Sequence, residues 1–410
     1  MLKRIIIMAL VLTLGVSVLT GCGAKNAAAK PGLKWNDKPS SKEEWMDNAK
    51  ITSLTNLGNT YRLKNAIEKA KNGEDVTIAY IGGSITEGDN KPTCYAARSF
   101  DYFVETFAKD PDKCHYVNAG ISGTPSVLGS LRLENDVLSK NPDIVFVEYA
   151  VNDGGEDIYY DAYESIIREC LEYESKPAVI LLFARMEEGW TSQDWKKEIG
   201  AHYDVSMISY ADGITYLFDN NVMQWSEFSH DYTHPHDEGN AVVADFIAYF
   251  YDEVNRQPAS ETDINVDMID PLYAEFYMGA HMFTSKNGSA VDMGTWKEGS
   301  SGFHYSDGWK KTWDDRNEAL VFEFTGKHAY VIYPASGTNT FGTLVANIYF
   351  NGEFVKTVEF NEYLEGGWNC PYVGTLYHSP KVGDYRIEFT AKEDNVKCDL
   401  QVLGVAYTDK

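Results

Sequence analysis

Hydrophobic positions in the first 256 residues fall into short apolar runs that alternate with longer amphipathic stretches. The apolar runs are rich in β-branched residues, which is typical of buried strands. They cover residues 76–81, 115–117, 143–149, 178–183 and 205–210. The amphipathic stretches predict helices at 60–71, 157–174 and 241–254. Because strands alternate with helices, the pattern predicts an α/β domain whose parallel sheet is covered on both faces.

The pattern changes after a polar stretch at residues 255–263. Beyond it, short segments alternate apolar and polar positions, as at 384–389. Residues 347–355 contain Asn351-Gly352, a pair that favours a tight hairpin turn between two strands. These signals predict an all-β, jelly-roll-like sandwich. We therefore predict an α/β domain at 51–256, a linker at 257–270 and a β-sandwich at 271–410.

The N-terminus has the features of an export signal. Lys3 and Arg4 precede an apolar run from Ile5 to Leu19, which is short for a membrane span. The sequence Leu-Thr-Gly-Cys at 19–22 resembles a bacterial lipobox, so we expect a signal peptide at 1–21 and a lipid, palmitate included, on Cys22. Residues 22–50 are then a tether. This predicts an exported protein, lipid-anchored at the bacterial cell surface.

Composition narrows the possible partners. The net charge of −25 argues against nucleic acid and against binding anionic lipid through a charged surface. The six cysteines show no Cys-x-x-Cys spacing, so neither a zinc ribbon nor a dense disulfide framework is indicated. A single bridge between Cys370 and Cys398 stays open, since both lie in an exported β-rich region.

Four short motifs near predicted strand ends carry the candidate chemistry. Ser84 follows two glycines, Gly120 and Asn152 come after the next two strands, and Asp231 stands three residues before His234. Each motif alone also fits a simple structural role, such as a glycine turn, a capping Asn or a surface His. Together they supply a nucleophile, oxyanion donors, a base and an acid that orients the base, which acyl transfer requires.

In order and context, these motifs resemble those of the SGNH (GDSL-type) hydrolase family over residues 51–256. The resemblance implies a flavodoxin-like three-layer sandwich and no cofactor or metal. It implies that Ser84 is the nucleophile, His234 the base and Asp231 its partner. The oxyanion would be held by the N–H groups of Ser84 and Gly120 and by the Asn152 amide.

One departure concerns the GDS block of the family, whose Asp is replaced here by Gly83. We associate this variant with carbohydrate-directed members, and it removes no catalytic group. The expected reaction is therefore a two-step hydrolysis of small acyl groups, mainly acetyl, on a polysaccharide or oligosaccharide. Trp309, Trp313 and Trp368 of the predicted β-sandwich are candidate glycan contacts, although core packing is an alternative for each. We expect the β-sandwich to bind polymer without affecting chemistry on a small ester.

Two other functions fit parts of the sequence. A metal-dependent hydrolase would use the cluster His230, His234 and His236. A surface lipoprotein that binds glycan without catalysis would need only an inert hydrolase-like domain. The first leaves Ser84 and Asn152 without a role, and the second does not explain why all four motifs are intact. The sequence identifies neither the glycan nor the hydroxyl that carries the acyl group.

Overall fold

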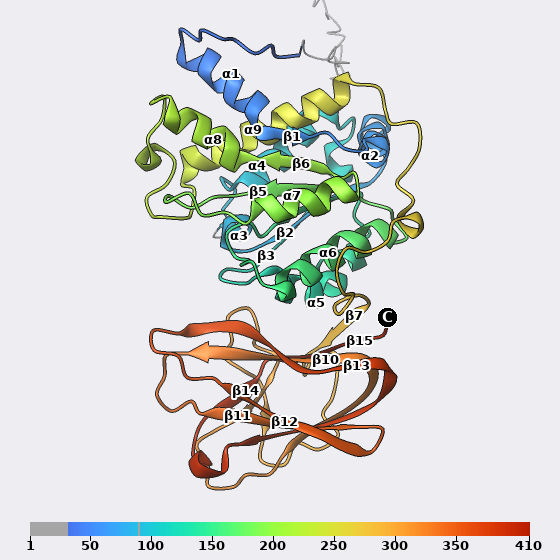
Figure 1. The fold of residues 1–410 in the computed structure, drawn as a ribbon, viewed down its shortest axis with the longest axis vertical. Helices are drawn as coiled ribbons and strands as arrows, with labels where there is room; N and C mark the ends of the chain where they lie inside the picture. The colour runs from blue at the N-terminus through green and yellow to red at the C-terminus, as the bar shows by residue number, and fades with distance from the viewer. Residues whose placement is uncertain (1–31, 89–90) are drawn as a thin grey trace, which may run out of the picture.

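The computed structural model describes residues 32–88 and 91–410 (Figure 1). The expected signal peptide and Cys22 lie outside the described residues. Within them, no helix has both the length and the apolarity needed to span a bilayer.

The N-terminal part is built on a six-stranded sheet in the order β1-β6-β5-β4-β2-β3. Strands β2 to β6 run parallel to their neighbours, and only β1 is antiparallel, to β6. β4 and β5 are buried along their whole length, as continuous apolar runs in a covered parallel sheet should be. The strands are β1 Leu54–Asn56, β2 Val76–Gly82, β3 Cys114–Gly120, β4 Ile144–Glu148, β5 Ala178–Phe183 and β6 Ser206–Ser209.

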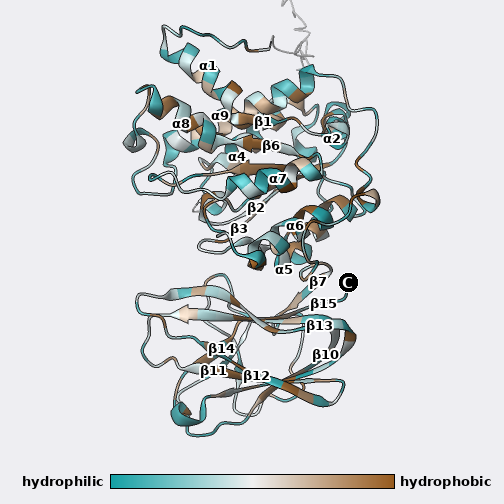
Figure 2. Cartoon of the chain, viewed as in Figure 1, coloured by the Kyte–Doolittle hydropathy of each residue, from teal (hydrophilic) through white to brown (hydrophobic). Residues whose placement is uncertain are grey.

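The helices pack in two groups, as expected of a three-layer sandwich. α1, α2, α4, α8 and α9 contact one another, and α5, α6 and α7 form the second group. The strands between them are largely brown in Figure 2, while the outer helices carry much teal. The helices are α1 Lys42–Ser53, α2 Tyr61–Asn72, α3 Ser84–Glu87, α4 Tyr95–Phe107, α5 Ser126–Asp136, α6 Asp157–Glu172, α7 Gln193–His202, α8 Tyr210–Asp219 and α9 Asp237–Arg256. The predicted α/β fold is confirmed.

The expected tether at 22–50 is wrong at its C-terminal end. Residues from Lys42 onward form α1, and Ser41 caps its N-terminus by accepting a hydrogen bond from Glu44 N–H. Trp45 and Met46 pack against the hydrophobic core, and this burial fixes the helix on the domain. The predicted domain start at residue 51 therefore falls inside a helix.

The C-terminal part consists of two antiparallel sheets, which confirms the predicted all-β fold. The six-stranded sheet has the order β12-β11-β13-β10-β15-β7, and the three-stranded sheet has the order β14-β9-β8. Asn351 and Gly352 both adopt positive φ, 53° and 81°, in the turn between β11 and β12. The strands are β7 Ala280–Phe283, β8 Lys297–Glu298, β9 Trp309–Lys311, β10 Leu320–Ser336, β11 Thr343–Phe350, β12 Glu353–Asn361, β13 Trp368–Ala391, β14 Leu400–Val402 and β15 Gly404–Thr408.

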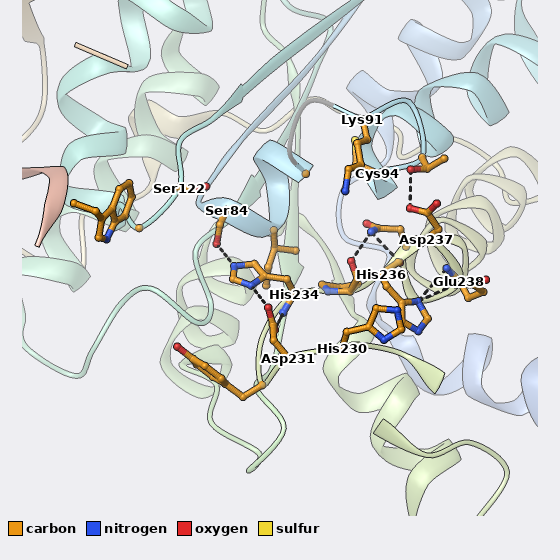
Figure 3. Close-up of a pocket in the computed structure, with 18 residues that line it drawn as sticks. Ser84, Lys91, Cys94, Ser122, His230, Asp231, His234, His236, Asp237 and Glu238 are labelled. Atoms are coloured by element: carbon orange, nitrogen blue, oxygen red, sulfur yellow. Dashed lines mark hydrogen bonds and ion pairs between the residues drawn. The ribbon is translucent and has the colours of Figure 1, made fainter. Parts of the chain in front are cut away.

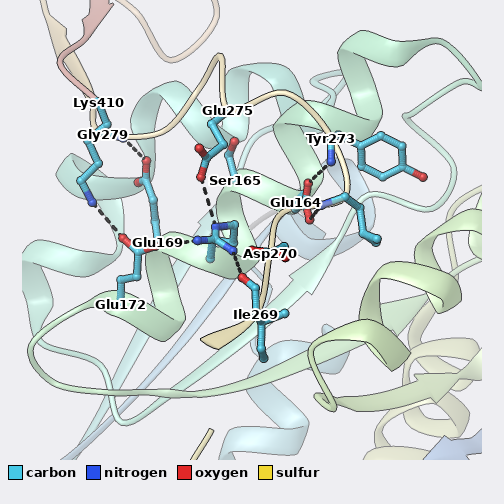
Figure 4. A network of polar contacts seen from close by, with 12 residues as sticks. Glu164, Ser165, Glu169, Glu172, Ile269, Asp270, Tyr273, Glu275, Gly279 and Lys410 are labelled. Atoms are coloured by element: carbon cyan, nitrogen blue, oxygen red, sulfur yellow. Dashed lines mark hydrogen bonds and ion pairs between the residues drawn. The ribbon is translucent and has the colours of Figure 1, made fainter. Parts of the chain in front are cut away.

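The connection between the two parts is fastened to α6 by a row of polar side chains (Figure 4). Glu164 accepts the N–H groups of Leu272 and Tyr273, and Glu169 accepts that of Gly279. Arg168 donates to the carbonyl of Ile269 at 2.9 Å. Burial raises the pKa of Glu169 to about 8, although the backbone N–H groups that it accepts and the positive charge of Lys410 oppose the shift.

The two parts also share an apolar core where α5 meets β7 (Figure 1). The α/β side contributes Ile121, Val127, Leu128, Leu131 and Ala162. The β side contributes Tyr277, Ala280, Met282, Tyr305, Tyr330, Ile332, Leu403 and Ala406. Because this cluster would be exposed to water if the two parts separated, burial holds them together.

Candidate active site

Ser84 lies where β2 ends and the short helix α3 begins. It follows Gly83, and a Cβ placed on Gly83 would lie 2.3 Å from Asn152 Oδ1 and 2.8 Å from its Cγ. Real side chains do not approach so closely, so the Asn152 amide packs on Gly83 only because this residue has no side chain. The departure at Gly83 thus has a structural reason in this chain: the glycine makes room for the amide beside Ser84.

Ser84, His234 and Asp231 form one hydrogen-bonded line (Figure 3). His234 Nε2 lies 2.7 Å from Ser84 Oγ, and His234 Nδ1 lies 2.8 Å from Asp231 Oδ2. The other oxygen of Asp231 accepts the backbone N–H groups of Thr233 and His234 at 2.7 and 2.6 Å. Burial opposes ionisation of Asp231, but these backbone and imidazole hydrogen bonds lower its pKa. A carboxylate held in this way fixes the imidazole for proton transfer from the serine.

The loop that carries His234 is braced at both ends. Ser229 Oγ donates to the carbonyl of His234 at 2.6 Å. His236 is the N-cap of α9, and its Nδ1 accepts the N–H groups of Glu238 and Gly239. An N-cap side chain satisfies helix donors that otherwise lack acceptors, so His236 anchors the loop on the helix.

Of the three predicted oxyanion donors, Ser84 and Asn152 lie side by side, whereas the N–H of Gly120 is already hydrogen-bonded. Ser84 is the first residue of α3, so its N–H has no acceptor within the helix. Asn152 lies beside it, and its buried Oδ1 has no partner among the described residues. Gly120 is different: its N–H donates to Asn118 Oδ1 at 2.9 Å. The prediction of Gly120 as an oxyanion donor is therefore wrong for this geometry.

Gly123 is the second glycine of the motif that contains Gly120. It lines the same cavity as Ser84 and His234, and also a second cavity beside Asn152. Its N–H makes no hydrogen bond within the part of the chain that the structure describes. The motif at 118–123 contains two glycines, and sequence spacing alone does not show which N–H faces the serine. Gly120 ends β3, whereas Gly123 lies in the following turn, with φ of 73°.

The cavity around Ser84 has a volume of about 780 Å³. Trp368, at the start of β13, is half-exposed and lines this cavity, so the β part contributes to the site. Trp313 is also half-exposed but does not line the cavity. Trp309 is 1% exposed and packs edge-on against Phe322 in the core. The suggestion that Trp309 contacts glycan is therefore wrong, since alternation along β9 turns it inward.

The three histidines of the alternative metal site are engaged otherwise. Both ring nitrogens of His234 bind side chains, and His236 Nδ1 accepts helix N–H groups. The His230 ring packs on that of His236 with centroids 4.3 Å apart. Among residues 32–88 and 91–410, no group of three or more His, Cys, Asp or Glu side chains is arranged to hold a metal ion. The geometry gives the metal alternative no support.

A buried ion pair that sequence reasoning missed supports the Asn152 loop. Lys196 Nζ lies 2.8 Å from Asp153 Oδ2, and both side chains are fully buried. The other oxygen of Asp153 accepts the N–H of Ser126, the first residue of α5. Burial lowers the pKa of Lys196 to about 8, although Asp153 opposes the shift. No spacing in the sequence links Lys196 to Asp153, so only the fold reveals this pair.

Five cysteines lie in the described part of the chain, and each carries a free thiol: Cys94, Cys114, Cys170, Cys370 and Cys398. The bridge between Cys370 and Cys398 that the sequence left open is therefore not formed. Cys370 instead places Sγ 3.5 Å from the carbonyl oxygen of Gly123, while Cys398 is buried in the β core.

Comparison with known proteins agrees with this site. Residues 80–242, within the N-terminal part, match the model of the GDSL-like lipase/acylhydrolase family. No curated protein matches the chain.

Two solved structures resemble nearly the whole chain. A two-domain esterase active on acetylated mannans is 28% identical, with a TM-score of 0.76 over 88% of this chain and 99% of that one. A structure of a two-domain esterase active on acetylated mannans, co-crystallised with mannopentaose, is 27% identical, with a TM-score of 0.74 over 88% of this chain and 98% of that one. The protein is an ester hydrolase with an α/β hydrolase domain followed by a β-domain.

Proposed function

We propose that this protein is a serine esterase that removes acetyl groups from a glycan through an acyl-enzyme. The observation that carries the proposal is the line from Ser84 through His234 to Asp231, with hydrogen bonds of 2.7 and 2.8 Å. Ser84 Oγ attacks the acyl carbonyl while His234 Nε2 takes its proton. The sugar hydroxyl leaves with that proton, and water then hydrolyses the acyl-enzyme with His234 again as base.

The tetrahedral oxyanion would be held by the N–H groups of Ser84 and Gly123 and by the Asn152 amide. All three lie beside the serine, and none is committed to another acceptor among the described residues. Preorganised donors of this kind are commonly the largest single contribution to acyl transfer, since loss of one lowers kcat by about 10²–10³.

A glycan substrate is supported by the chain's similarity to two-domain esterases active on acetylated mannans. Trp368 adds a half-exposed indole to the cavity wall, and sugar rings stack on such surfaces. We propose acetylated mannan as the first substrate to test. A glycan-binding protein without catalysis is the alternative, but it leaves the aligned Ser84 and His234 unexplained.

The experiment is release of acetate from acetylated mannan and from nitrophenyl acetate. Ser84→Ala should lower turnover of both by about 10³-fold or more, because no other group in the line forms the acyl-enzyme. Ser139→Ala is the matched control, since this serine is exposed and lies away from the cavity. A folded Ser84→Ala protein with normal turnover would refute the mechanism, and activity on the small ester alone would refute the glycan.

We also propose that the protein is exported and anchored by lipid on Cys22. The motif at 19–22, after a short apolar run, supports this. Intact-mass spectrometry of natively processed protein should find a lipidated Cys22 at the mature N-terminus, and Cys22→Ser should release the protein from membranes. An unmodified residue 22 in processed protein would contradict the proposal.

A further inference from the structure

Glu87 links α3, the helix that begins with Ser84, to the loop at Ser122 and to the β-domain. It ends α3, three residues after Ser84, and its side chain is buried. One carboxylate oxygen accepts the N–H of Ser122 at 2.9 Å and also the Ser122 hydroxyl. The other lies 2.7 Å from Nε2 of His304, which belongs to the β-domain. One buried carboxylate thus binds the catalytic helix, the loop that carries Gly123 and the second domain.

The β-domain contacts that same loop at a second point. A Cβ on Gly123 would lie 2.7 Å from the Trp368 ring and 3.0 Å from Cys370 Sγ, so both side chains pack directly on this glycine. The Cys370 thiol also lies 3.5 Å from the carbonyl oxygen of Gly123. The turn at Ser122 and Gly123 is therefore enclosed between the α/β domain and the start of β13.

The backbone at His304 is consistent with a constrained contact. His304 has φ of 61°, in the left-handed region that residues other than glycine seldom occupy. Such a conformation persists only where the surroundings impose it. Here the imidazole lies against Glu87, and its ring packs edge-on against Phe303, which in turn packs against Trp368.

We propose that Glu87 and His304 are positioning residues through which the β-domain fixes the oxyanion loop of Ser122 and Gly123 relative to Ser84. The inference rests on the proposed function and deepens it: the β-domain sets the rate of the chemical step itself, besides any contact with glycan. Without His304, one oxygen of a buried carboxylate loses its partner. Glu87 then shifts toward water, and the Ser122 N–H and hydroxyl follow it.

The test uses the full-length protein and nitrophenyl acetate, which is too small to report binding of a glycan chain. His304→Ala should lower kcat about tenfold with KM within twofold, since a displaced oxyanion donor costs part of the 10²–10³ of a deleted one. His304→Gln should recover most of the activity, because its amide can donate to Glu87. Glu87→Gln should lower kcat at least as much as His304→Ala, because an uncharged amide oxygen accepts the Ser122 N–H and hydroxyl more weakly than a carboxylate does. His281→Ala, which removes another β-domain imidazole paired with a carboxylate, is the matched control.

A second readout separates positioning from general damage. Phenylboronic acid forms a tetrahedral adduct with an activated serine, so its affinity reports the oxyanion donors. The inference predicts that this affinity falls in parallel with kcat in His304→Ala while the melting temperature stays near that of His281→Ala. Wild-type kcat and boronate affinity in a folded His304→Ala protein would overturn it, as would an equal loss in His281→Ala. If the wild type itself had no esterase activity, the proposed function would fail, and the boronate affinities would still decide the positioning of the loop.

Discussion

Gly83→Ala should lower activity indirectly, by displacing the side-chain amide of Asn152. The new Cβ would lie 2.3 Å from Asn152 Oδ1 and 3.0 Å from Nδ2, and ordinary contacts begin near 3.4 Å. The amide must therefore retreat by about 1 Å, a displacement that can cost 10²-fold in rate. We expect kcat on nitrophenyl acetate to fall about 10²-fold, close to the loss from deleting an oxyanion donor.

The assay is a double-mutant cycle with Asn152→Ala. If Gly83→Ala acts by displacing the amide, the double variant should be no less active than Asn152→Ala alone, because the displaced group is already absent. Gly155→Ala is the matched control, since a Cβ there meets only Tyr160 Oη at 3.7 Å. Additive losses, or normal kcat in Gly83→Ala, would show that the glycine does not make room for a functional amide.

Three further predictions concern stability, measured by urea or thermal unfolding. Lys196→Met leaves Asp153 charged and unpaired in the core and should destabilise the protein by about 3–5 kcal/mol; a loss below 1 kcal/mol would contradict a buried ion pair. Burial raises the pKa of Glu169 to about 8, so between its unfolded pKa and pH 8 the folded state binds one more proton than the unfolded state. The stability of the fold therefore falls as pH rises through this range. Glu169→Gln should reduce the difference in melting temperature between pH 6 and pH 8.5, and Glu172→Gln should not. Trp309→Ala should lose about 3–5 kcal/mol, as a core aromatic does, and Trp313→Ala almost nothing; equal effects would put Trp309 at the surface.

The sequence predicted the α/β architecture well because each buried strand there carries its own signal. A parallel strand covered on both faces must be apolar along its length, and β5 coincides with the predicted run at 178–183. The hairpin at Asn351-Gly352 was equally easy to predict, since few residue pairs tolerate two positive φ angles in succession. The line of Ser84, His234 and Asp231 followed from chemistry and order, and the structure brings these side chains together.

Other parts of the site depend on contacts that no local pattern encodes. Gly120 and Gly123 belong to one short motif, and their different surroundings depend on the Asn118 side chain, which accepts the Gly120 N–H, and on the turn after β3. The pair of Asp153 and Lys196 joins residues from two different elements. The sequence does not distinguish Trp309 from Trp368. Strand alternation in β9 buries Trp309, whereas Trp368 is half-exposed at the start of β13.

How firmly the two parts are joined could not be predicted from the sequence either. A polar stretch such as 255–263 is typical of a flexible connection between independent domains. Here the connection that follows is bound to α6 through Glu164 and Glu169, and α5 shares an apolar core with β7 and β15. Removing the β-domain would expose that core and release Gly123 from Trp368 and Cys370. Because the β-domain packs on Gly123 and shares this core, its effect on activity must be tested by substitutions at the interface and not by truncation.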